Sequence, residues 1–338
     1  MYSDTLHDDF ALAGWLRTVR QSALREIHAV IARPGILSFA LGMPATDLFP
    51  AADYARAQAR ALEDPRAMQY GLPHRGLTRH VVELMARRGV TCREEQVFLT
   101  NGAQHGMSLM GRLLVDPGAT VITEELCYDG IHTALRPQRP RILTVPTGPD
   151  GIDVDAVERR LEAGERPAFV YTITDGHNPL GVSLSPAKRA RLVELAQTYR
   201  VPILEDDAYG FLSLDGEAPP PMRALDERWV YYIGSFAKVL APALRVAWLV
   251  VPEPLVPLLS ATRQGNDLDV STLAQHAVSA WLDDGRFPAH LARLRGEYTL
   301  RRDAMLRALG EHFPAEARWR RPGAGLFVWV ELPREVDA

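Results

Sequence analysis

Short apolar runs alternate with longer amphipathic stretches between residues 96 and 251. The runs are rich in β-branched and aromatic residues and almost continuously apolar, which is typical of parallel strands buried on both faces. They predict strands at Val97–Thr100, Thr120–Thr123, Phe169–Ile173, Pro202–Glu205, Val230–Ile233 and Val246–Val251. The stretches between several of them predict helices at Ala103–Leu114, Asp153–Ala163 and Pro186–Tyr199. This order indicates an α/β fold, with a mostly parallel central sheet and helices on both faces.

The pattern changes after Val251. Two long helical stretches, Ser271–Asp284 and Pro288–Phe313, precede a single apolar strand at Leu326–Leu332. We therefore expect three parts along the chain. Residues 1–45 form an N-terminal arm that is part of the small domain, residues 46–252 form the large α/β domain, and residues 253–338 form a smaller, C-terminally incomplete α+β domain.

Composition excludes several classes of protein. The 338 residues carry 38 basic and 42 acidic side chains, a formal charge of −4, and the charges are interspersed, which argues against a nucleic-acid surface. The sequence has neither an apolar run of about 18 residues nor an apolar signal-peptide core, so we expect a cytoplasmic protein without a membrane span. The two cysteines, Cys92 and Cys127, are too few for a disulfide scaffold and wrongly spaced for zinc, and they are interpreted as small buried apolar residues.

Ligands of open α/β sheets bind at the carboxyl ends of the strands, so the polar residues that follow each predicted strand are candidates for a site. Each has an ordinary structural explanation when taken alone, such as a turn, a packed aromatic ring, a helix cap or a surface charge. The groups in question are Asn101-Gly102-Ala103-Gln104, Tyr128, His177-Asn178, Asp206 with Tyr209, and Ser235 with Lys238 and Arg245.

Taken together, these residues describe one ligand. A helix N-terminus, Ser235 and Arg245 suit an anionic end, and Tyr128 suits a flat ring. Asp206 suits a basic ring atom, and Lys238 suits an electrophilic carbon. Only two of the 38 basic residues are lysines, and the other one, Lys188, lies in a helix away from these motifs, where we expect it to face solvent. Arginine cannot replace lysine here, because its guanidinium stays protonated. This combination predicts pyridoxal 5′-phosphate, whose enzymes use a lysine Schiff base and an aspartate beside the pyridinium nitrogen.

The sequence resembles the fold-type I pyridoxal-phosphate-dependent aminotransferases of class I/II. It is most similar to the branch that contains 2-aminoadipate, aromatic and branched-chain transaminases and the aminotransferase-like domains of certain transcription regulators. The resemblance extends from Ile36 to Leu332. It is carried by Ser38-Phe39-Ala40-Leu41-Gly42-Met43-Pro44, Gln69-Tyr70-Gly71, Asn101-Gly102-Ala103-Gln104, Asp116-Pro117-Gly118, His177-Asn178-Pro179-Leu180-Gly181, Glu205-Asp206-Asp207-Ala208-Tyr209 and the segment from Gly234 to Arg245.

The resemblance implies a role for each matching residue. Lys238, Asp206 and Tyr128 are the implied catalytic residues: Lys238 forms the internal aldimine, Asp206 pairs with the pyridine nitrogen, and Tyr128 stacks on the ring. The remaining implied contacts are Asn178 and Tyr209 at the ring 3′-oxygen, Ala103, Gln104, Ser235 and Arg245 at the phosphate, Tyr70 at the phosphate of a neighbouring subunit in a homodimer, and Gly42 with Asn178 at the substrate.

The implied function is an aminotransferase of amino-acid metabolism, which moves an amino group from an L-amino acid to a 2-oxo acid by a ping-pong mechanism. Alternatives are another pyridoxal-phosphate reaction (oxidase, cyclase, lyase or racemase), a coenzyme-sensing domain of a regulator, and a catalytically impaired relative.

The sequence also departs from the family pattern. Ala237 stands where many relatives have a hydroxyl residue, Ala243 and Ala247 replace common glycines, and Leu41 replaces the first glycine of a pair. Relatives continue for roughly another 50–70 residues, a stretch that normally holds the arginine for the substrate carboxylate.

Overall fold

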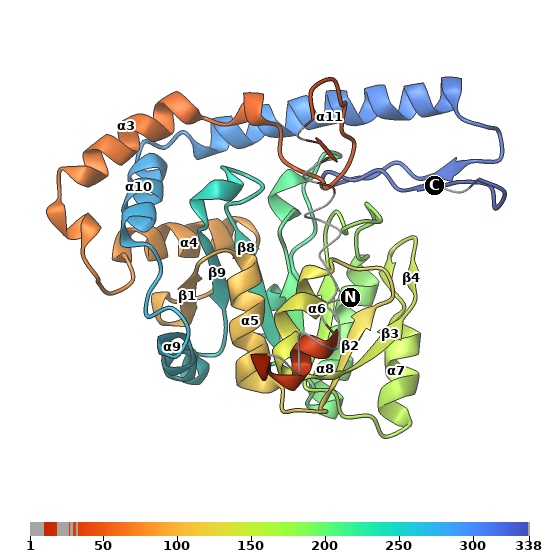
Figure 1. Ribbon diagram of the computed structural model, residues 1–338, viewed down its shortest axis with the longest axis horizontal. Coiled ribbons are helices and arrows are strands. Elements are labelled where there is room, and N and C mark those ends of the chain that lie inside the picture. The colour runs from red at the N-terminus through yellow and green to blue at the C-terminus, as the bar shows by residue number, and fades with distance from the viewer. Residues whose placement is uncertain (1–9, 19–26, 28–29, 32, 337–338) are drawn as a thin grey trace.

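A seven-stranded sheet forms the centre of the computed structural model, which describes residues 10–18, 27, 30–31 and 33–336 (Figure 1). The strand order is β1-β9-β8-β7-β6-β2-β3, and only β9 runs against its neighbours, so the prediction of a mostly parallel sheet is confirmed. The strands are β1 (Val97–Thr100), β2 (Thr120–Glu124), β3 (Arg141–Val145), β6 (Val170–Ile173), β7 (Ile203–Asp206), β8 (Val230–Ser235) and β9 (Ala247–Val250).

The edge strand β3 is absent from the sequence-based expectation, and its burial explains why. Four of its five residues are exposed or half-buried and only Val145 is buried, whereas β1, β2, β6, β7, β8 and β9 are buried throughout. A continuous apolar run therefore marks the interior strands but not this edge.

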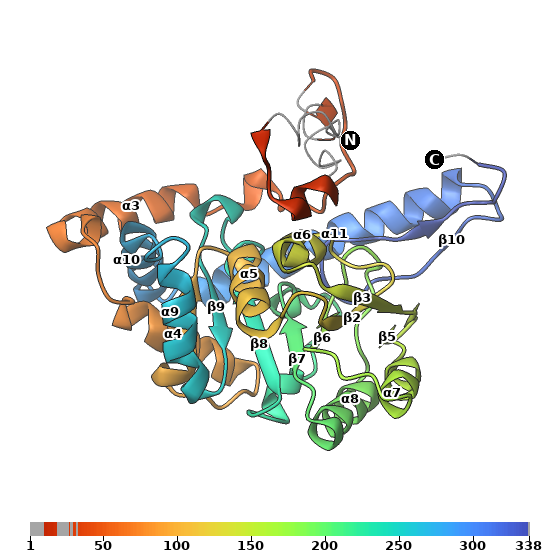
Figure 2. The same ribbon diagram turned by 60° about the horizontal axis from the view of Figure 1, so that its bottom comes forward.

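Helices cover both faces of the sheet, as expected (Figure 2). Neighbouring residues of β7 show the two faces, because Ile203 packs into one hydrophobic cluster and Leu204 into the other. The helices α5 (Ala103–Leu114) and α6 (Gly130–Leu135) cover one face, and α7 (Val154–Glu162) and α8 (Pro186–Tyr199) cover the other. The remaining helices beside the sheet are α4 (Arg75–Arg87) and α9 (Val256–Gln264).

Helix α8 begins as its sequence predicts. The Ser185 hydroxyl accepts a hydrogen bond from the backbone N–H of Lys188 at 3.4 Å, and Pro186 occupies the first helical position. Contrary to expectation, the Lys188 side chain is not simply solvent-facing, since its ammonium forms an ion pair with Asp150 at 2.6 Å. Of the two cysteines, Cys92 is buried and Cys127 is half-buried, and both are free.

The C-terminal part of the described chain contains α10 (Thr272–Asp283) and the long helix α11 (Phe287–His312), which crosses the top of Figure 1. Helix α10 packs against α3 (Ala51–Leu62) and α4, so the last third of the chain contacts the segment that precedes the sheet. The proposed division at residues 45 and 252 stays a prediction, and residues 1–9, 19–26, 28–29 and 32 of the N-terminal arm lie outside the described residues.

The strand expected at residues 326–332 is shorter than predicted. Only β11 (Val330–Glu331) pairs, with β10 (Arg318–Trp319), and β4 (Thr147–Gly148) pairs with β5 (Gly151–Ile152). The residues before β11 have a different partner, because Ala324 bridges to Ser213 and the Gly325 N–H donates to Leu212 O at 3.1 Å. No helix in the described part of the chain is long and apolar enough to cross a membrane.

Candidate active site

The N-terminus of α5 forms a cradle for an anion. Gly102 precedes the helix with φ +87°, and no side chain caps the backbone N–H groups of the first turn, which begins at Ala103. The Arg245 guanidinium lies directly against Gly102, where it donates to Asn101 O at 3.0 Å. A Cβ atom at position 102 would come within 2.1 Å of Arg245 Nη2, so this close approach requires glycine. Free amides at a helix N-terminus beside a guanidinium suit a phosphate.

Two other predicted phosphate contacts are held near this cradle by hydrogen bonds. The Gln104 amide donates to Gly130 O at 2.6 Å and accepts from the Tyr128 hydroxyl at 3.2 Å. Ser235 ends β8, buried, and its hydroxyl accepts from Ala237 N–H at 3.1 Å. The Gln104–Tyr128 bond therefore fixes the orientation of the half-buried ring that is predicted to stack on the coenzyme.

Asp206 ends β7 as a buried carboxylate with one free oxygen. Its Oδ2 accepts from the Tyr171 hydroxyl at 2.8 Å, and its Oδ1 has no hydrogen-bond partner among the described residues. Burial raises the pKa of Asp206 to about 6, although the Tyr171 hydrogen bond opposes that rise. A buried carboxylate oxygen without a donor is costly, so this position suits a cationic N–H group.

Lys238 follows β8 and reaches toward the N-terminal segment. Its Nζ donates to Gly42 O at 3.2 Å and lies 5.7 Å from the centre of the Tyr209 ring. Burial lowers the pKa of Lys238, while the nearby charge of Asp206 opposes that change. A lowered pKa increases the fraction of neutral amine, which is the form that attacks a carbonyl carbon.

Tyr209 and Asn178 meet, as their predicted shared role requires. The two side chains interact with each other, and Tyr209 is only 3% exposed. Burial raises the pKa of Tyr209 above its ordinary value, so its hydroxyl keeps its proton and acts as a donor. The structure thus gathers Gly42, Ala103, Gln104, Tyr128, Asn178, Asp206, Tyr209, Ser235, Lys238 and Arg245 around the carboxyl ends of the parallel strands.

Tyr70 is not part of this group within the single chain. It lies in the loop between the 3-10 helix η3 (Pro65–Met68) and α4, and 80% of its surface is exposed. Its predicted role, a contact with the phosphate of a neighbouring subunit, requires such exposure but stays a prediction.

Two residues of the site were not foreseen in the sequence. Tyr171 lies inside a predicted strand, two positions before Ile173, the residue of β6 that pairs with Asp206. Side chains two positions apart in a strand point to the same face of the sheet. Phe327 packs against Gly42 and meets the Tyr209 ring edge-on at 6.0 Å. Its sequence signal is weak, since an aromatic residue in an apolar run is most simply a core residue.

The residues present fit pyridoxal 5′-phosphate. The free Asp206 oxygen suits its pyridinium N–H, and the cradle at Gly102 suits its phosphate. The amine of Lys238 suits its aldehyde carbon.

Comparisons with known proteins agree with this geometry. The sequence profile of the aminotransferase class I and II family matches residues 34–338. The chain is 40% identical over 328 residues to a 2-aminoadipate transaminase of Thermus thermophilus, covering 95% of this chain and 81% of that protein. It is 32% identical over 330 residues to an aromatic-amino-acid aminotransferase of Thermococcus litoralis, covering 94% of this chain and 79% of that protein.

A solved structure shows the same fold with a coenzyme derivative bound. It is an α-aminoadipate aminotransferase of Thermus thermophilus in complex with N-(5′-phosphopyridoxyl)-L-leucine. It has a TM-score of 0.90 and 36% sequence identity, and the match covers 98% of this chain and 84% of that one. The chain therefore belongs to the class I and II aminotransferases of fold type I, and it is a pyridoxal 5′-phosphate-dependent enzyme that transfers amino groups between amino acids and 2-oxo acids.

Proposed function

We propose that Lys238 is the residue that binds the coenzyme covalently and moves the proton in amino transfer, with Asp206 holding the pyridine nitrogen. The observation that carries this proposal is the pairing of a half-buried amine, at 3.2 Å from Gly42 O, with a buried aspartate whose second oxygen lacks a donor among the described residues. The coenzyme, when bound, supplies an electron sink next to the substrate α-carbon.

The roles of the protein side chains follow from their environments. Asp206 keeps a proton on the ring nitrogen by charge attraction, since a nearby carboxylate favours the protonated cation. Once released from the coenzyme, the amine of Lys238 acts as a general base that accepts the α-proton of the substrate. It then acts as a general acid that donates this proton to the coenzyme carbon. Tyr209, buried and protonated, donates toward the ring 3′-oxygen together with Asn178.

The names of the relatives guide our inference about the side chain of the substrate. The relatives in Thermus thermophilus and Thermococcus litoralis are named for 2-aminoadipate and for aromatic amino acids. Beside Lys238, Phe327 supplies an apolar surface against Gly42. We propose that L-2-aminoadipate and the aromatic amino acids are donors, with 2-oxo acids as acceptors.

The chain provides a matched control for the lysine assignment, because it has only two lysines. Lys238→Ala is expected to abolish the visible absorbance band of covalently bound coenzyme and to reduce transamination by at least about 10⁴-fold. Lys188→Ala, which removes an ion pair with Asp150, is expected to leave both unchanged. A band that persists in Lys238→Ala would refute the assignment.

The reaction type is tested by half-reactions. An amino-acid donor added alone is expected to convert the bound coenzyme to its amine form, and a 2-oxo acid is expected to restore the original spectrum. Oxygen consumption, or ammonia release without an acceptor, would instead indicate one of the other pyridoxal-phosphate reactions.

We also propose that the enzyme is a homodimer with shared active sites. Large apolar side chains are strongly exposed in two segments, at Leu37 (87%) and Phe39 (83%) and at Tyr70 (80%) and Leu72 (90%). Such exposure is unusual for a monomer and is typical of an interface. Both segments adjoin predicted site residues, namely Gly42 in the first and Tyr70 in the second.

A further inference from the structure

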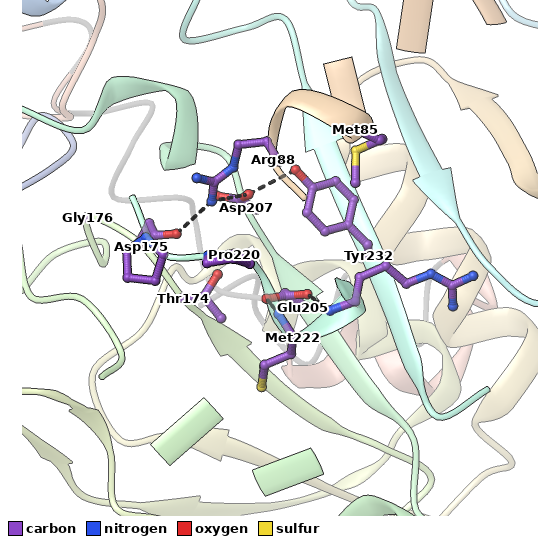
Figure 3. A network of polar contacts seen from close by, with 12 residues as sticks. Met85, Arg88, Thr174, Asp175, Gly176, Glu205, Asp207, Pro220, Met222 and Tyr232 are labelled. Atoms are coloured by element: carbon purple, nitrogen blue, oxygen red, sulfur yellow. Dashed lines mark hydrogen bonds and ion pairs between the residues drawn. The ribbon is translucent and has the colours of Figure 1, made fainter. Parts of the chain in front are cut away.

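A buried ion-pair network lies next to the two loops that carry Asn178 and Tyr209, and it is not part of the predicted site (Figure 3). Its centre is Arg88, the C-cap residue directly after α4. The Arg88 Nη2 atom lies 3.0 Å from Asp175 Oδ2 and 3.1 Å from Asp207 Oδ2. Both aspartates are 1% exposed, and Figure 3 shows the guanidinium pointing to both.

The two aspartates belong to the two loops that carry predicted coenzyme contacts. Asp175 follows β6 by two residues and lies three residues before Asn178. Asp207 directly follows Asp206 and lies two residues before Tyr209. A single guanidinium therefore ties together the ends of two neighbouring strands at the point where their side chains reach the coenzyme.

Other side chains complete the network and balance its charge. Arg189 Nη2 donates to Asp175 Oδ1 at 2.7 Å, and the Tyr232 hydroxyl donates to Asp207 Oδ2 at 2.9 Å. Two buried cations thus face two buried anions. Removing one partner from such a group leaves an uncompensated charge, which is far more costly than the net gain from the pair.

Glycine at position 210 makes room for the network. A Cβ atom there would come within 2.2 Å of Asp207 Oδ1 and 2.4 Å of Arg88 Nη2. The backbone of the Tyr209 loop therefore lies directly on the Arg88–Asp207 pair, so a shift of that pair moves the loop.

We propose that Arg88 is a positioning residue for the coenzyme, which holds the Asp175 and Asp207 loops in register so that Asn178, Asp206 and Tyr209 face one ligand. This inference rests on the proposed roles of those three residues.

The network also acts on the charge of Asp206. Burial raises the pKa of Asp206, and the adjacent charge of Asp207 contributes to the rise. Arg88 is a cation paired with Asp207, so its loss leaves the full charge of Asp207 beside Asp206 and raises the pKa of Asp206 further. The titratable groups that interact with Asp206 are Tyr128, Tyr171, Asp207, Tyr209 and Lys238.

The test compares Arg88→Met with Arg223→Met. Arg223 is also buried, and among the described residues its guanidinium donates to the backbone oxygens of Glu227 and Val230 rather than to a carboxylate of the network. The readout is the dissociation constant of pyridoxal phosphate for the apoprotein, measured by tryptophan fluorescence from pH 6 to pH 9. We expect Arg88→Met to weaken binding about 10–100-fold, as is typical when the partner of a ligand-holding residue is lost, and Arg223→Met to change it less than about threefold.

The pH dependence separates positioning from a general loss of stability. In Arg88→Met the raised pKa keeps Asp206 protonated to a higher pH than in the wild type. The loss of coenzyme affinity in this variant is therefore expected to be larger at pH 6 than at pH 9. The double variant Arg88→Met/Asp207→Asn, which removes both charges, is expected to recover part of the affinity at pH 6. A pH-independent defect that Asp207→Asn does not relieve, or an affinity equal to that of Arg223→Met, overturns the proposal.

Two further arms keep the test decisive. If Arg88→Met does not fold, Arg88→Lys serves instead. It keeps the positive charge but not the guanidinium geometry that contacts both aspartates, so it must weaken coenzyme binding by a smaller factor that does not depend on pH. An affinity equal to that of Arg223→Met overturns the proposal in this case too. The wild type and Lys238→Ala are measured first, because a wild type without a covalent coenzyme band contradicts the proposed function and not the role of Arg88.

Discussion

Three consecutive carboxyls at the end of β7 are buried, and each has a different environment. Glu205 accepts the backbone N–H groups of Met222 and Arg223 at 2.7 and 2.9 Å. Asp207 is paired with Arg88, and Asp206 has one tyrosine and one oxygen without a donor among the described residues. Asp207 Oδ1 also lacks a donor among the described residues, but Arg88 forms an ion pair with that carboxylate. Of the three, Asp206 is therefore the carboxyl that has a free oxygen and no ion pair among the described residues.

These carboxyls predict how the stability of the apoprotein depends on pH. Burial raises the pKa of Asp206 from 3.8 to about 6 and that of Glu205 from 4.5 to about 7. These two carboxyls then bind more protons in the folded chain than in the unfolded chain between about pH 4 and pH 7. Their contribution to the free energy of unfolding therefore falls as the pH rises through that window.

Asp206→Asn isolates the contribution of Asp206. In urea unfolding of the apoproteins, the loss of stability between pH 5 and pH 8 is expected to be smaller in the variant by about 1 to 2 kcal/mol. The contributions of the other carboxyls to the pH dependence are the same in both proteins and cancel in this comparison. The same variant is expected to bind the coenzyme more weakly, because it lacks the charge that holds the pyridinium. Equal pH slopes in the two proteins would contradict the raised pKa of Asp206.

Residue-level contacts explain what the sequence could and could not predict. Lys238, Asp206 and Asn178 lie in short motifs at strand ends, so their positions follow from the order of the elements. Tyr171 and Arg88 act through partners 35 and 119 positions away, Asp206 and Asp207 respectively, and nothing in their local sequence distinguishes them from a strand tyrosine and a helix-end arginine. Such contacts are fixed by the tertiary fold, which sequence periodicity does not describe.

At the scale of elements, the site depends on how single strands and helices begin and end. The predicted bounds of β1, α5 and α8 agree with the structure, and a polar or glycine residue stands directly before each of them, namely Gln96, Gly102 and Ser185. Residues 326–332 were predicted wrongly as a continuous strand. Within that run Phe327 packs on Gly42 and the Tyr209 ring, so its apolar character reflects contact with the active site rather than strand pairing. The backbone hydrogen bonds to residues 212–214 come from Gly323 and Gly325, just before the run.

The start of α5 offers a prediction with an internal control. Gly102 and Gly118 both have positive φ, at +87° and +82°, so alanine at either site carries a similar backbone cost of about 1–2 kcal/mol. Only at Gly102 would the new methyl group collide with Arg245, since nothing lies within 4 Å of a Cβ at Gly118.

Gly102→Ala is therefore expected to displace the guanidinium and weaken coenzyme binding about 10-fold or more, the typical effect of losing one hydrogen bond to a charged group. Both variants are expected to lower the melting temperature by similar amounts, because their backbone costs are similar. Gly118→Ala is expected to leave the affinity for the coenzyme unchanged. Titration of both apoproteins with pyridoxal phosphate, and with inorganic phosphate as competitor, measures the difference. An equal loss of affinity in both variants would show that backbone strain, and not the displaced arginine, is responsible.

At the scale of the whole molecule, segments far apart in the chain converge on Lys238. Gly42 approaches from the N-terminal segment, Phe327 from the C-terminal segment, and the strand ends supply the remainder. A site assembled from such distant segments is sensitive to how they are held. Apolar residues near Gly42 and at Tyr70 are exposed in the single chain, and under the proposed homodimer a second copy of the chain covers them.

Subunit mixing tests this arrangement directly. Lys238→Ala is expected to be inactive, and Tyr70→Ala is expected to have weak coenzyme binding, because each dimer site needs its own lysine and the tyrosine of its partner. A heterodimer of the two variants contains one site with an intact Lys238 and an intact Tyr70 from the partner. Random exchange of equal amounts is therefore expected to restore about a quarter of the wild-type transaminase activity. Sedimentation checks that dimers form. Exchange that restores no activity would show that Tyr70 does not act across the interface, and monomeric sedimentation would refute the dimer.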